Sequence, residues 1–540
     1  MQGLAVGGRP YRQESFVGLA IFSKDFICFR SQGETMKSVR KQLISLVREL
    51  QNQQESSELE FKKAEEKLPE SFWETYSSFA NTGGGYILLG VNETPWEVKG
   101  VKNPNKILSD LCNSANNKDV VSYNLIENKY LQVHSIEDKK IISVYVPEVE
   151  EARKPVYLKG NPLNAYIRKH EGDYKISEDD LKRFSRNAQQ ALDGELLDEY
   201  ILEDLNVDSV LAFKNHLHSR NPSKNYLAMD NLEFLQQIGA YQIDRRDQRK
   251  PKMTVACLLF FGKYQAIRQK FPHFHLEYLN HRHAEGKMRW SDRVCTGDLT
   301  YQDMNVFEFF HLVWEKLRAT IQDCFELDRN SERKSPAELQ EALREALANM
   351  LIHADYFDWE TDVKVTAEDL YYTFTNPGKM LVTESQFFMG GVTRPRNTTL
   401  IGFFRNMGIS DRAGTGGATL LNFAAVNRFH APEIRTSLAS TVLKLWIAAP
   451  LESHPEFDEK EKMIYEYIFK SKDAVSVPEL EKTTGLTLYQ IRKVLASLTE
   501  RSLLTKMGRA RATRYVCTPS IVERKDIVDR LRRSLLEMGN

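Results

Sequence analysis

The sequence predicts a multidomain protein of mixed α/β and α+β architecture. The chain has 540 residues, which is too many for one hydrophobic core. Strand-like apolar runs alternate with amphipathic helical patterns in two separate stretches, at 50–186 and 336–446. The charged segment "APLESHPEFDEKE", with two prolines, indicates a linker at 447–457 before a last module at 458–519.

The composition fits a globular protein without a chain-wide charge bias. Apolar residues make up 41% of the chain, and 74 basic residues balance 74 acidic ones. This balance excludes a uniformly basic nucleic-acid-binding chain but allows local basic patches. No apolar run approaches the roughly 20 residues that span a bilayer, so no membrane partner is expected.

The cysteines are scattered, with no CxxC pair and no neighbouring histidine cluster. This pattern argues against a zinc site or a disulfide framework and fits isolated thiols in a reducing cytoplasm. The N-terminus also lacks the basic and apolar segments of a signal peptide, so a cytoplasmic protein is expected. The six cysteines are Cys28, Cys112, Cys257, Cys295, Cys324 and Cys517.

The two ends of the chain are expected to lie outside the main modules. Residues 1–35 lack clear periodicity, whereas Met36 opens "MKSVRKQLISLVREL", whose apolar residues recur at helical spacing. We therefore interpret residues 1–49 as an extension followed by a helix, with Met36 as the natural start. Residues 520–540 are expected to form a C-terminal helix.

A glycine turn is the clearest signal in the first module. In "FANTGGGYILLGVNE", three glycines separate a helix predicted from Ser71 to Ala80 from the most strand-like run, "YILLGV". Glycine permits positive φ and close backbone approach. By spacing alone, a tight helix-to-strand connection without chemistry is the simpler interpretation.

Three acidic residues surround this turn. Glu55 and Glu60 precede the helix, and Glu93 follows the strand. Site residues gather at strand ends in α/β folds, and clustered carboxylates can hold a divalent metal for phosphodiester cleavage. The alternative is that these are solvated surface glutamates.

The segments "ESSELEFK", "FANTGGGYILLGVNE", "KPVY" and "AYIRKHEG" together resemble the Schlafen-type AlbA-like domain over residues 50–186. Bacterial members are described as DNA-binding or transcription-regulator modules, and animal relatives include endoribonucleases that cut transfer RNA with an acidic triad. The resemblance implies Glu55, Glu60 and Glu93 as that triad, with Mg²⁺ or Mn²⁺ bound. Glu93 stands where relatives tend to have an aspartate. Phosphate contacts are expected from Lys62, Arg168 and Lys169, with ordinary surface charge as the alternative.

Residues 187–335 are interpreted as a connecting region. It contains "MTVACLLFFG", a continuous apolar run that is predicted to be a strand at 253–262. Residues 303–325 are predicted to be helical.

The next helix pairs a carboxylate with an amide. In "ALREALANMLIHADYF", Glu345 and Asn349 lie one turn apart on the edge of an apolar helix face. In nucleotide hydrolysis, a carboxylate activates water while an amide oxygen binds Mg²⁺. The alternative is an ordinary helix edge at a domain boundary.

The order REAxxNxxxHxDY, NPG, RN and GTG resembles the ATP-binding module of the GHKL superfamily, a Bergerat-type α/β sandwich, at 336–446. The resemblance implies ATP and Mg²⁺ as cofactors, Glu345 as general base and Asn349 as metal ligand. It also implies a nucleotide-facing turn at Gly378 and a phosphate lid at 414–416 (Gly414, Thr415 and Gly416). Asn376 replaces the superfamily's adenine-reading aspartate and the lid is short, so ATP binding is expected without fast hydrolysis.

The last module has the pattern of a winged helix-turn-helix. A first helix is followed by a short helix that ends at Gly485, and Thr487 caps a third helix. Two strands then flank "RARA". Nucleic-acid contacts are expected from this basic region, with dimer or domain contacts as the alternative. The candidate residues are Tyr489, Gln490, Arg492 and Lys493 on the third helix, and Lys506, Arg509, Arg511 and Arg514 on the wing.

Together these features predict an ATP-responsive nucleic-acid-binding regulator of bacterial type, acting as a homodimer. The rival prediction is an enzyme, a Schlafen-like metal-dependent endoribonuclease that acts on transfer RNA or other structured RNA in phage defence. A third possibility is an assembly scaffold in which both sites are degenerate.

Overall fold

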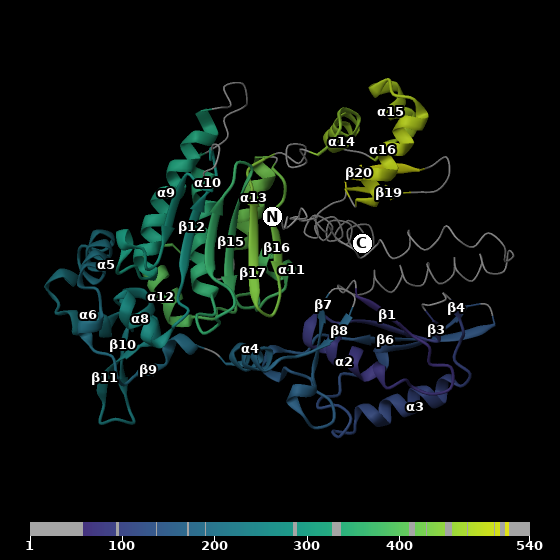
Figure 1. The fold of residues 1–540 in the computed structure, drawn as a ribbon, viewed down its shortest axis with the longest axis horizontal. Helices are drawn as coiled ribbons and strands as arrows, with labels where there is room; N and C mark the ends of the chain where they lie inside the picture. Colours follow the sequence, from purple (N-terminus) through teal and green to yellow (C-terminus); the bar gives the residue numbers. More distant parts are fainter. Residues whose placement is uncertain are drawn as a thin grey trace, which may run out of the picture. The chain divides into compact units, whose positions relative to one another are not determined.

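The computed structural model divides the chain into two compact units, which are described separately (Figure 1). Unit 1 comprises Met1–Leu181 and Phe457–Thr518, and unit 2 comprises Lys182–Glu456 and Pro519–Asn540. Helix α4 (Glu178–Ala188) contains the first boundary between them. The structure describes residues 58–92, 97–136, 138–169, 172–189, 191–284, 289–326, 336–409, 416–427, 429–448, 456–471, 474–501, 503–507 and 513–517.

The first part of unit 1 is a four-stranded sheet in the order β1-β2-β6-β5, in which the central strand β2 is buried on both faces. Helices α2 and α3 cover one face, where Phe72, Phe79 and Ile107 are fully buried with Ile87 and Val144. A smaller apolar cluster covers the other face. The elements are β1 (Leu59–Lys62), α2 (Ser71–Thr82), β2 (Gly85–Leu89), α3 (Pro104–Ala115), β5 (Leu131–Ile136) and β6 (Lys139–Val146), with the small pairs β3 (Val91–Asn92)–β4 (Glu97–Val98) and β7 (Tyr166–Lys169)–β8 (Gly172–Lys175).

The glycine turn joins α2 to β2, as predicted. Gly84 has φ +72°, and a Cβ on Gly85 would lie 2.7 Å from the Phe79 ring, so both positions favour glycine. The neighbouring Asn81 is buried and links segments that are distant in sequence. Its Nδ2 donates to the carbonyls of Val156 (2.9 Å) and Tyr166 (3.0 Å), and its Oδ1 accepts from the Val156 N–H (2.7 Å). Segments that carry the family resemblance are therefore hydrogen-bonded to one another, and these bonds hold distant parts of the chain together.

The last module of unit 1 has three helices and a three-stranded antiparallel sheet in the order β18-β20-β19. Ile491, Val494, Leu495 and Leu498 are buried, as the apolar spacing predicted. Gly485 ends the second helix in a left-handed conformation, and the Thr487 side chain caps the third; both predictions are confirmed. The elements are α14 (Glu459–Lys470), β18 (Val475–Ser476), α15 (Val477–Thr484), α16 (Leu488–Glu500), β19 (Leu504–Met507) and β20 (Arg514–Cys517).

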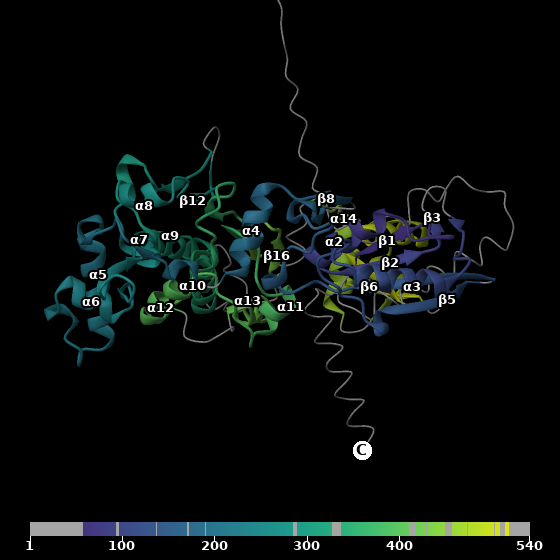
Figure 2. The same cartoon turned by 90° about the horizontal axis from the view of Figure 1, so that it is seen from below.

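Unit 2 is built on a six-stranded sheet in the order β13-β12-β14-β15-β17-β16, whose β12–β14 pair is parallel. Figures 1 and 2 show α10 beside α13, and α13 beside α11, in this unit. The sheet elements are β12 (Leu276–Asn280), β13 (Asp292–Cys295), β14 (Val363–Ala367), β15 (Tyr371–Pro377), β16 (Glu433–Thr436) and β17 (Ser440–Trp446). The helices around it are α9 (Val306–Glu326), α10 (Pro336–His353), α11 (Glu384–Met389), α12 (Thr398–Asn406) and α13 (Gly416–Val426).

The strand predicted at 253–262 is wrong. Lys250–Thr254 forms β11, and Val255–Phe261 forms helix α7, in which every residue is buried. A fully buried helix lacks a polar face, so its apolar run looks like that of a buried strand. The Thr254 side chain starts the helix by accepting the Cys257 N–H at 3.1 Å.

The six-stranded sheet also extends further back in sequence than the predicted module at 336–446. Strands β12 and β13 precede residue 336, and β12 pairs with β14 in parallel. The connecting region thus contributes two strands and helix α9 to this body. Its other elements are β9 (Leu196–Leu197), α5 (Val207–Arg220), α6 (Asn231–Gln237), β10 (Tyr241–Asp244), β11, α7 and α8 (Tyr264–Lys270).

No described helix combines the length and apolar character needed to cross a bilayer. Cys112, Cys257, Cys295 and Cys517 are free thiols.

Candidate functional site

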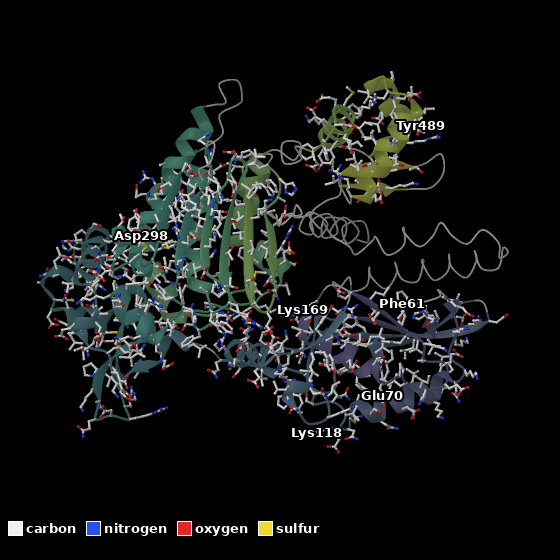
Figure 3. All side chains as sticks on the ribbon, viewed as in Figure 1. Phe61, Glu70, Lys118, Lys169, Asp298 and Tyr489 are labelled. Atoms are coloured by element: carbon white, nitrogen blue, oxygen red, sulfur yellow. The ribbon has the colours of Figure 1, made fainter. Side chains whose placement is uncertain are left out.

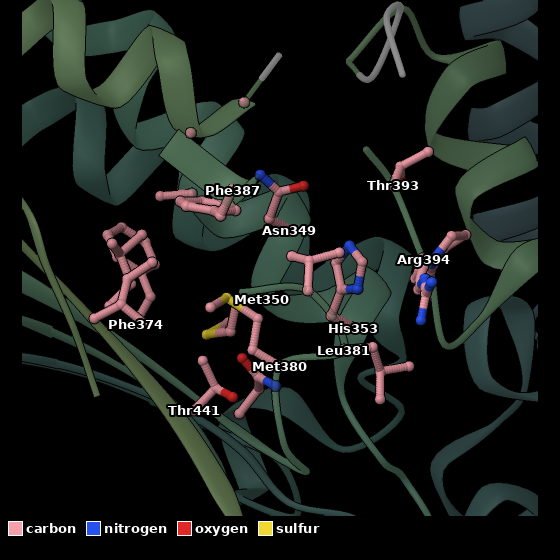
Figure 4. Close-up of a pocket in the computed structure, with 18 of the residues that line it drawn as sticks. Asn349, Met350, His353, Phe374, Met380, Leu381, Phe387, Thr393, Arg394 and Thr441 are labelled. Atoms are coloured by element: carbon pink, nitrogen blue, oxygen red, sulfur yellow. The ribbon is translucent and has the colours of Figure 1, made fainter. Parts of the chain in front are cut away.

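A cavity of about 190 Å³ lies in unit 2 between α10, the sheet and the start of α13. Figure 4 shows Asn349 and His353 projecting into it from one helix, with Phe374 and Thr441 on the strand side. The loop residues Thr393 and Arg394 line another side. The cavity therefore brings together polar groups from elements far apart in the sequence, as a ligand site does.

Glu345 and Asn349 stand at one end of this cavity. The Asn349 Nδ2 donates to the Glu345 Oε1 at 3.1 Å. Burial raises the pKa of the Glu345 carboxyl above its ordinary value, and the hydrogen bond from Asn349 opposes this shift. A Cβ on Gly416 would overlap the ends of both side chains, so the start of α13 lies directly against them.

Asn376 and Thr441 lie at the sheet end of the cavity, as cross-strand partners on β15 and β17. The buried Asn376 donates through Nδ2 to the Pro377 carbonyl at 3.1 Å. Thr441 Oγ1 donates to the Gly378 carbonyl at 2.9 Å. Gly378 has φ +91° and its N–H donates to the Ala439 carbonyl at 2.7 Å, which fixes the turn.

Several cavity residues were not among the predicted site residues. His353 is one turn beyond Asn349, and burial together with the charge of Arg396 lowers its pKa to about 4. The imidazole is therefore neutral near pH 7. Lys379, Arg394 and Arg405 also line the cavity. The i+4 spacing of His353 marked it in the sequence, whereas Lys379, Arg394 and Arg405 were given no role there.

Hydrogen bonds from the buried Arg396 support the loop that carries Arg394. Arg396 Nη1 donates to the Asn187 Oδ1 at 2.7 Å, and its Nη2 donates to the Lys379 carbonyl at 3.0 Å. The segment after α10 is held in the same way, since Arg183 pairs with Asp358 through Nε at 2.6 Å. Charge-assisted bonds between such buried groups make the cavity wall rigid.

The acidic site predicted in unit 1 has cations beside Glu60. Glu55 and Glu93 lie outside the described residues, so only Glu60 can be placed. It lies 2.9 Å from both the Lys62 Nζ and the Arg168 Nη2. Its carboxylate is therefore held by two cations.

Arg168 is the centre of this cluster, which we call the Arg168 cluster: Arg168, Glu58, Glu60 and Asp173. The guanidinium contacts Glu60, Asp173 (2.9 Å) and, at 3.6 Å, Glu58. Only 6% of the Arg168 side chain is exposed, whereas its predicted companion Lys169 is exposed (Figure 3). Glu58 and Asp173 were not identified from the sequence as partners of Arg168. Asp173 is far from Glu60 in the chain, so the sequence gives no sign that they share a cation.

Some of the residues that were predicted to bind nucleic acid in the last module are exposed. Tyr489 on α16 is 78% exposed (Figure 3). Gln490 instead accepts from the Thr487 N–H at 3.0 Å as part of a helix cap. The other exposed candidates are Arg492, Lys493, Lys506 and Arg514, while Gly414, Thr415, Arg509 and Arg511 lie outside the described residues.

Two segments of the chain match protein-family models. Residues 55–177 match the family described as Schlafen, AlbA_2, which confirms the Schlafen-type AlbA-like part of the resemblance. Residues 182–277 match a domain of unknown function, DUF8451. No curated protein matches the chain.

Two solved structures show limited similarity. The DIP2311 protein from Corynebacterium diphtheriae is 13% identical, covers 88% of this chain and 99% of its own length, and has a TM-score of 0.34. The N-terminal domain of a RecG-related protein from Nitrosomonas europaea is 29% identical, covers 25% of this chain and 92% of its own length, and has a TM-score of 0.18. TM-scores this low support no argument about this chain.

Proposed function

We propose that this chain is a nucleic-acid-binding regulator that responds to ATP. The observation that carries the proposal is the cavity of unit 2. It places a carboxylate and an amide, Glu345 and Asn349, against the glycine start of a helix, and two polar strand residues, Asn376 and Thr441, on the side of the sheet. The resemblance to the GHKL superfamily implies Glu345 as general base and Asn349 as metal ligand, and both of these residues line the cavity.

The residues of the cavity fit ATP with Mg²⁺. The Asn349 amide nitrogen is engaged by Glu345, which leaves the amide oxygen to bind Mg²⁺. Backbone N–H groups at the start of α13 suit phosphate, and Lys379, Arg394 and Arg405 supply compensating positive charge. Apolar residues, among them Phe374, offer a wall for a base.

Binding, rather than rapid hydrolysis, is the proposed role of ATP. Glu345 is the only carboxylate among the described residues that line the cavity, and its raised pKa suits a general base. However, its Oε1 accepts a hydrogen bond from the Asn349 amide, which stabilises the ionised carboxylate and makes it a weaker base. Slow turnover would leave the nucleotide bound long enough to act as a signal.

The last module is the proposed nucleic-acid reader. Arg492 and Lys493 on α16 are exposed and suit phosphate contacts. Tyr489 beside them offers an aromatic ring for stacking or base contact. The AlbA-like domain supports a nucleic-acid-related role through the family resemblance of residues 55–177.

Binding measurements on the full-length chain test this proposal. Isothermal titration calorimetry with ATP and Mg²⁺ should give one site per chain, weakened when Mg²⁺ is omitted. Affinity for DNA and RNA, measured by fluorescence anisotropy at fixed salt, should then differ with and without ATP–Mg²⁺. No ATP binding, or nucleic-acid affinity that is the same in both conditions, would contradict it. The predicted homodimer can be checked in the same samples by light scattering.

The endoribonuclease alternative has weaker support. Glu60, the member of the predicted triad that can be placed, is neutralised by Arg168 and Lys62. A catalytic metal would have to compete with both cations for its oxygens. Incubating the chain with transfer RNA and Mg²⁺ or Mn²⁺ decides the matter, because cleavage that is lost in Glu60→Ala would favour this alternative.

A further inference from the structure

We infer that His275, Glu277 and Cys295 form a binding site for a transition-metal ion of the zinc class, independent of the proposed nucleotide site. His275 directly precedes β12, Glu277 lies within β12, and Cys295 ends β13. One ligand atom from each of the three lies within 4.8 Å of the others. An imidazole nitrogen, a thiol sulfur and a carboxylate oxygen are the donors that zinc takes in proteins.

Strand geometry brings the three donors together. Side chains alternate along a strand, so His275 and Glu277 are on the same side of the sheet. The antiparallel register pairs Glu277 directly with Cys295. Cross-strand partners of this kind have neighbouring Cβ atoms, which makes the site a fixed feature of the sheet.

The distance between the two softer donors suits a shared ion. The Cys295 Sγ and His275 Nε2 are 3.7 Å apart. A tetrahedral zinc ion with ordinary Zn–S and Zn–N bonds holds its sulfur and nitrogen ligands about 3.6 Å apart. The two side chains are therefore already spaced as they would be around the ion.

Neighbouring groups hold the donors in place. The Thr296 hydroxyl lies 3.5 Å from the His275 Nδ1, which leaves Nε2 on the side of the thiol. The Glu277 Oε1 pairs with Arg293 at 3.0 Å and its Oε2 with Lys364 at 3.2 Å. Metal-bound histidines and carboxylates are oriented by such outer contacts. Each carboxylate oxygen also has a second lone pair for an ion.

The charges set the character of the site. Zinc binds the thiolate, so the Cys295 proton, now directed to the Thr296 carbonyl at 3.4 Å, must leave when the ion binds. The thiolate and the Glu277 carboxylate then balance the two charges of the ion. Arg293 and Lys364 remain close by and limit the affinity. With three protein donors, the ion keeps a fourth position for water.

Cobalt titration of the metal-stripped full-length chain tests the site. Co²⁺ should bind with a stoichiometry of one and produce a thiolate-to-cobalt charge-transfer band, and one equivalent of Zn²⁺ should abolish this band. Cys295→Ser should eliminate the band, and His275→Ala should weaken binding at least tenfold. Cys112→Ser, which removes a thiol from helix α3, is the matched control and should leave the spectrum unchanged.

Circular dichroism of each variant separates loss of a ligand from loss of the fold. The wild-type titration needs no variant: a chain that gives no thiolate band with stoichiometric Co²⁺ overturns the inference. A band that persists in Cys295→Ser overturns it as well, because another thiol would then be the ligand. ATP binding should be the same in the metal-stripped and metal-loaded chain, so a failure here is distinct from a failure of the proposed nucleotide site.

Discussion

The cavity of unit 2 and the Arg168 cluster of unit 1 each contain a glutamate that the sequence predicts to be catalytic, in opposite surroundings. Glu345 receives a hydrogen bond from a neutral amide, and no described ion pair includes it. Glu60 lies 2.9 Å from each of two cations. Ion pairs compensate the negative charge of Glu60. The charge of Glu345 has no such compensation among the described residues, and burial raises the pKa of its carboxyl.

The difference separates a carboxylate that stabilises the fold from one that is available for binding or catalysis. A carboxylate that is held by fixed cations contributes to the fold, and those cations lower its affinity for a further cation. A carboxylate with a raised pKa beside a cavity is typical of functional sites. By this criterion Glu345 is a better candidate for functional chemistry than Glu60. Variants at both sites test the comparison.

The largest expected effect comes from Arg168→Ala. This change leaves Glu60 and Asp173 close together without their shared counter-ion, so the free energy of unfolding of unit 1 should fall by about 3 kcal/mol. Hydrogen exchange of the amides in α2 and β7 of the full-length chain measures the loss locally.

Lys169→Ala is the matched control, because Lys169 is the exposed neighbour on the same strand. It should change local stability by less than about 0.5 kcal/mol. If both variants exchange equally fast, Arg168 does not hold the cluster together and the structural interpretation of Glu60 is wrong.

The next effect concerns the helix start beside Glu345. A Cβ on Gly417 would overlap the Phe387 carbonyl, so Gly417→Ala should destabilise unit 2 by about 2 kcal/mol. Gly402 lies within helix α12 with nothing within 4 Å of the corresponding position. Gly402→Ala should therefore stabilise the chain by about 0.5 kcal/mol. Thermal denaturation of the two variants, compared with the wild type, should give shifts of opposite sign; shifts of the same sign would show that the start of α13 has room to adjust.

The sequence predicted local features correctly where a residue type has one main structural role. The glycines of the turn, the cap at Thr487 and the glycine end at Gly485 are of this kind. It failed at α7, because an apolar run without a polar face has no period that separates helix from strand.

Contacts between distant segments were the other limit. Nothing near Arg168 in the sequence indicates that its guanidinium binds Glu60, and the scattered cysteines hid the approach of Cys295 to His275. The approach of Cys295 to His275 follows from strand register, which the pattern of one strand does not fix. The Arg168–Glu60 pair joins strands of two different sheets, which no local pattern predicts. The match of Glu345 and Asn349 to a cavity was accessible because both lie on one helix at i and i+4.

A smaller effect is expected for ligand binding at the cavity. Asn349→Ala removes the proposed Mg²⁺ ligand, so the Kd for ATP–Mg²⁺ should rise about tenfold, equivalent to about 1.4 kcal/mol. The exposed Asn406, at the end of α12, provides the same substitution as a control and should leave the Kd unchanged. Calorimetry on both variants with and without Mg²⁺ measures this, and equal loss in the two conditions would show that Asn349 does not act through the metal.

A pH-dependent effect tests whether the cavity keeps its histidine neutral. The pKa of His353 is lowered to about 4, mainly by burial, against about 6.5 in an unfolded chain. Between these values the unfolded state binds more protons, so this contribution to stability is complete above pH 6.5 and is lost as the pH falls toward 4. His353→Gln should flatten the pH profile of the melting temperature in this range.

Other groups titrate in the same window, so the difference between the two profiles is the quantity to measure. Burial raises the pKa of Asp193 to about 6, which gives a contribution of opposite sign: stability falls as the pH rises toward 6. This contribution is common to the wild type and to His353→Gln and cancels in the difference. A difference that grows between pH 6.5 and pH 4 confirms that burial in the cavity wall suppresses the charge of His353. Parallel profiles would mean that the His353 imidazole binds a proton as readily in the folded chain as in the unfolded chain. The cavity wall would then tolerate the charge of a protonated His353 as well as the Arg168 cluster tolerates its charges.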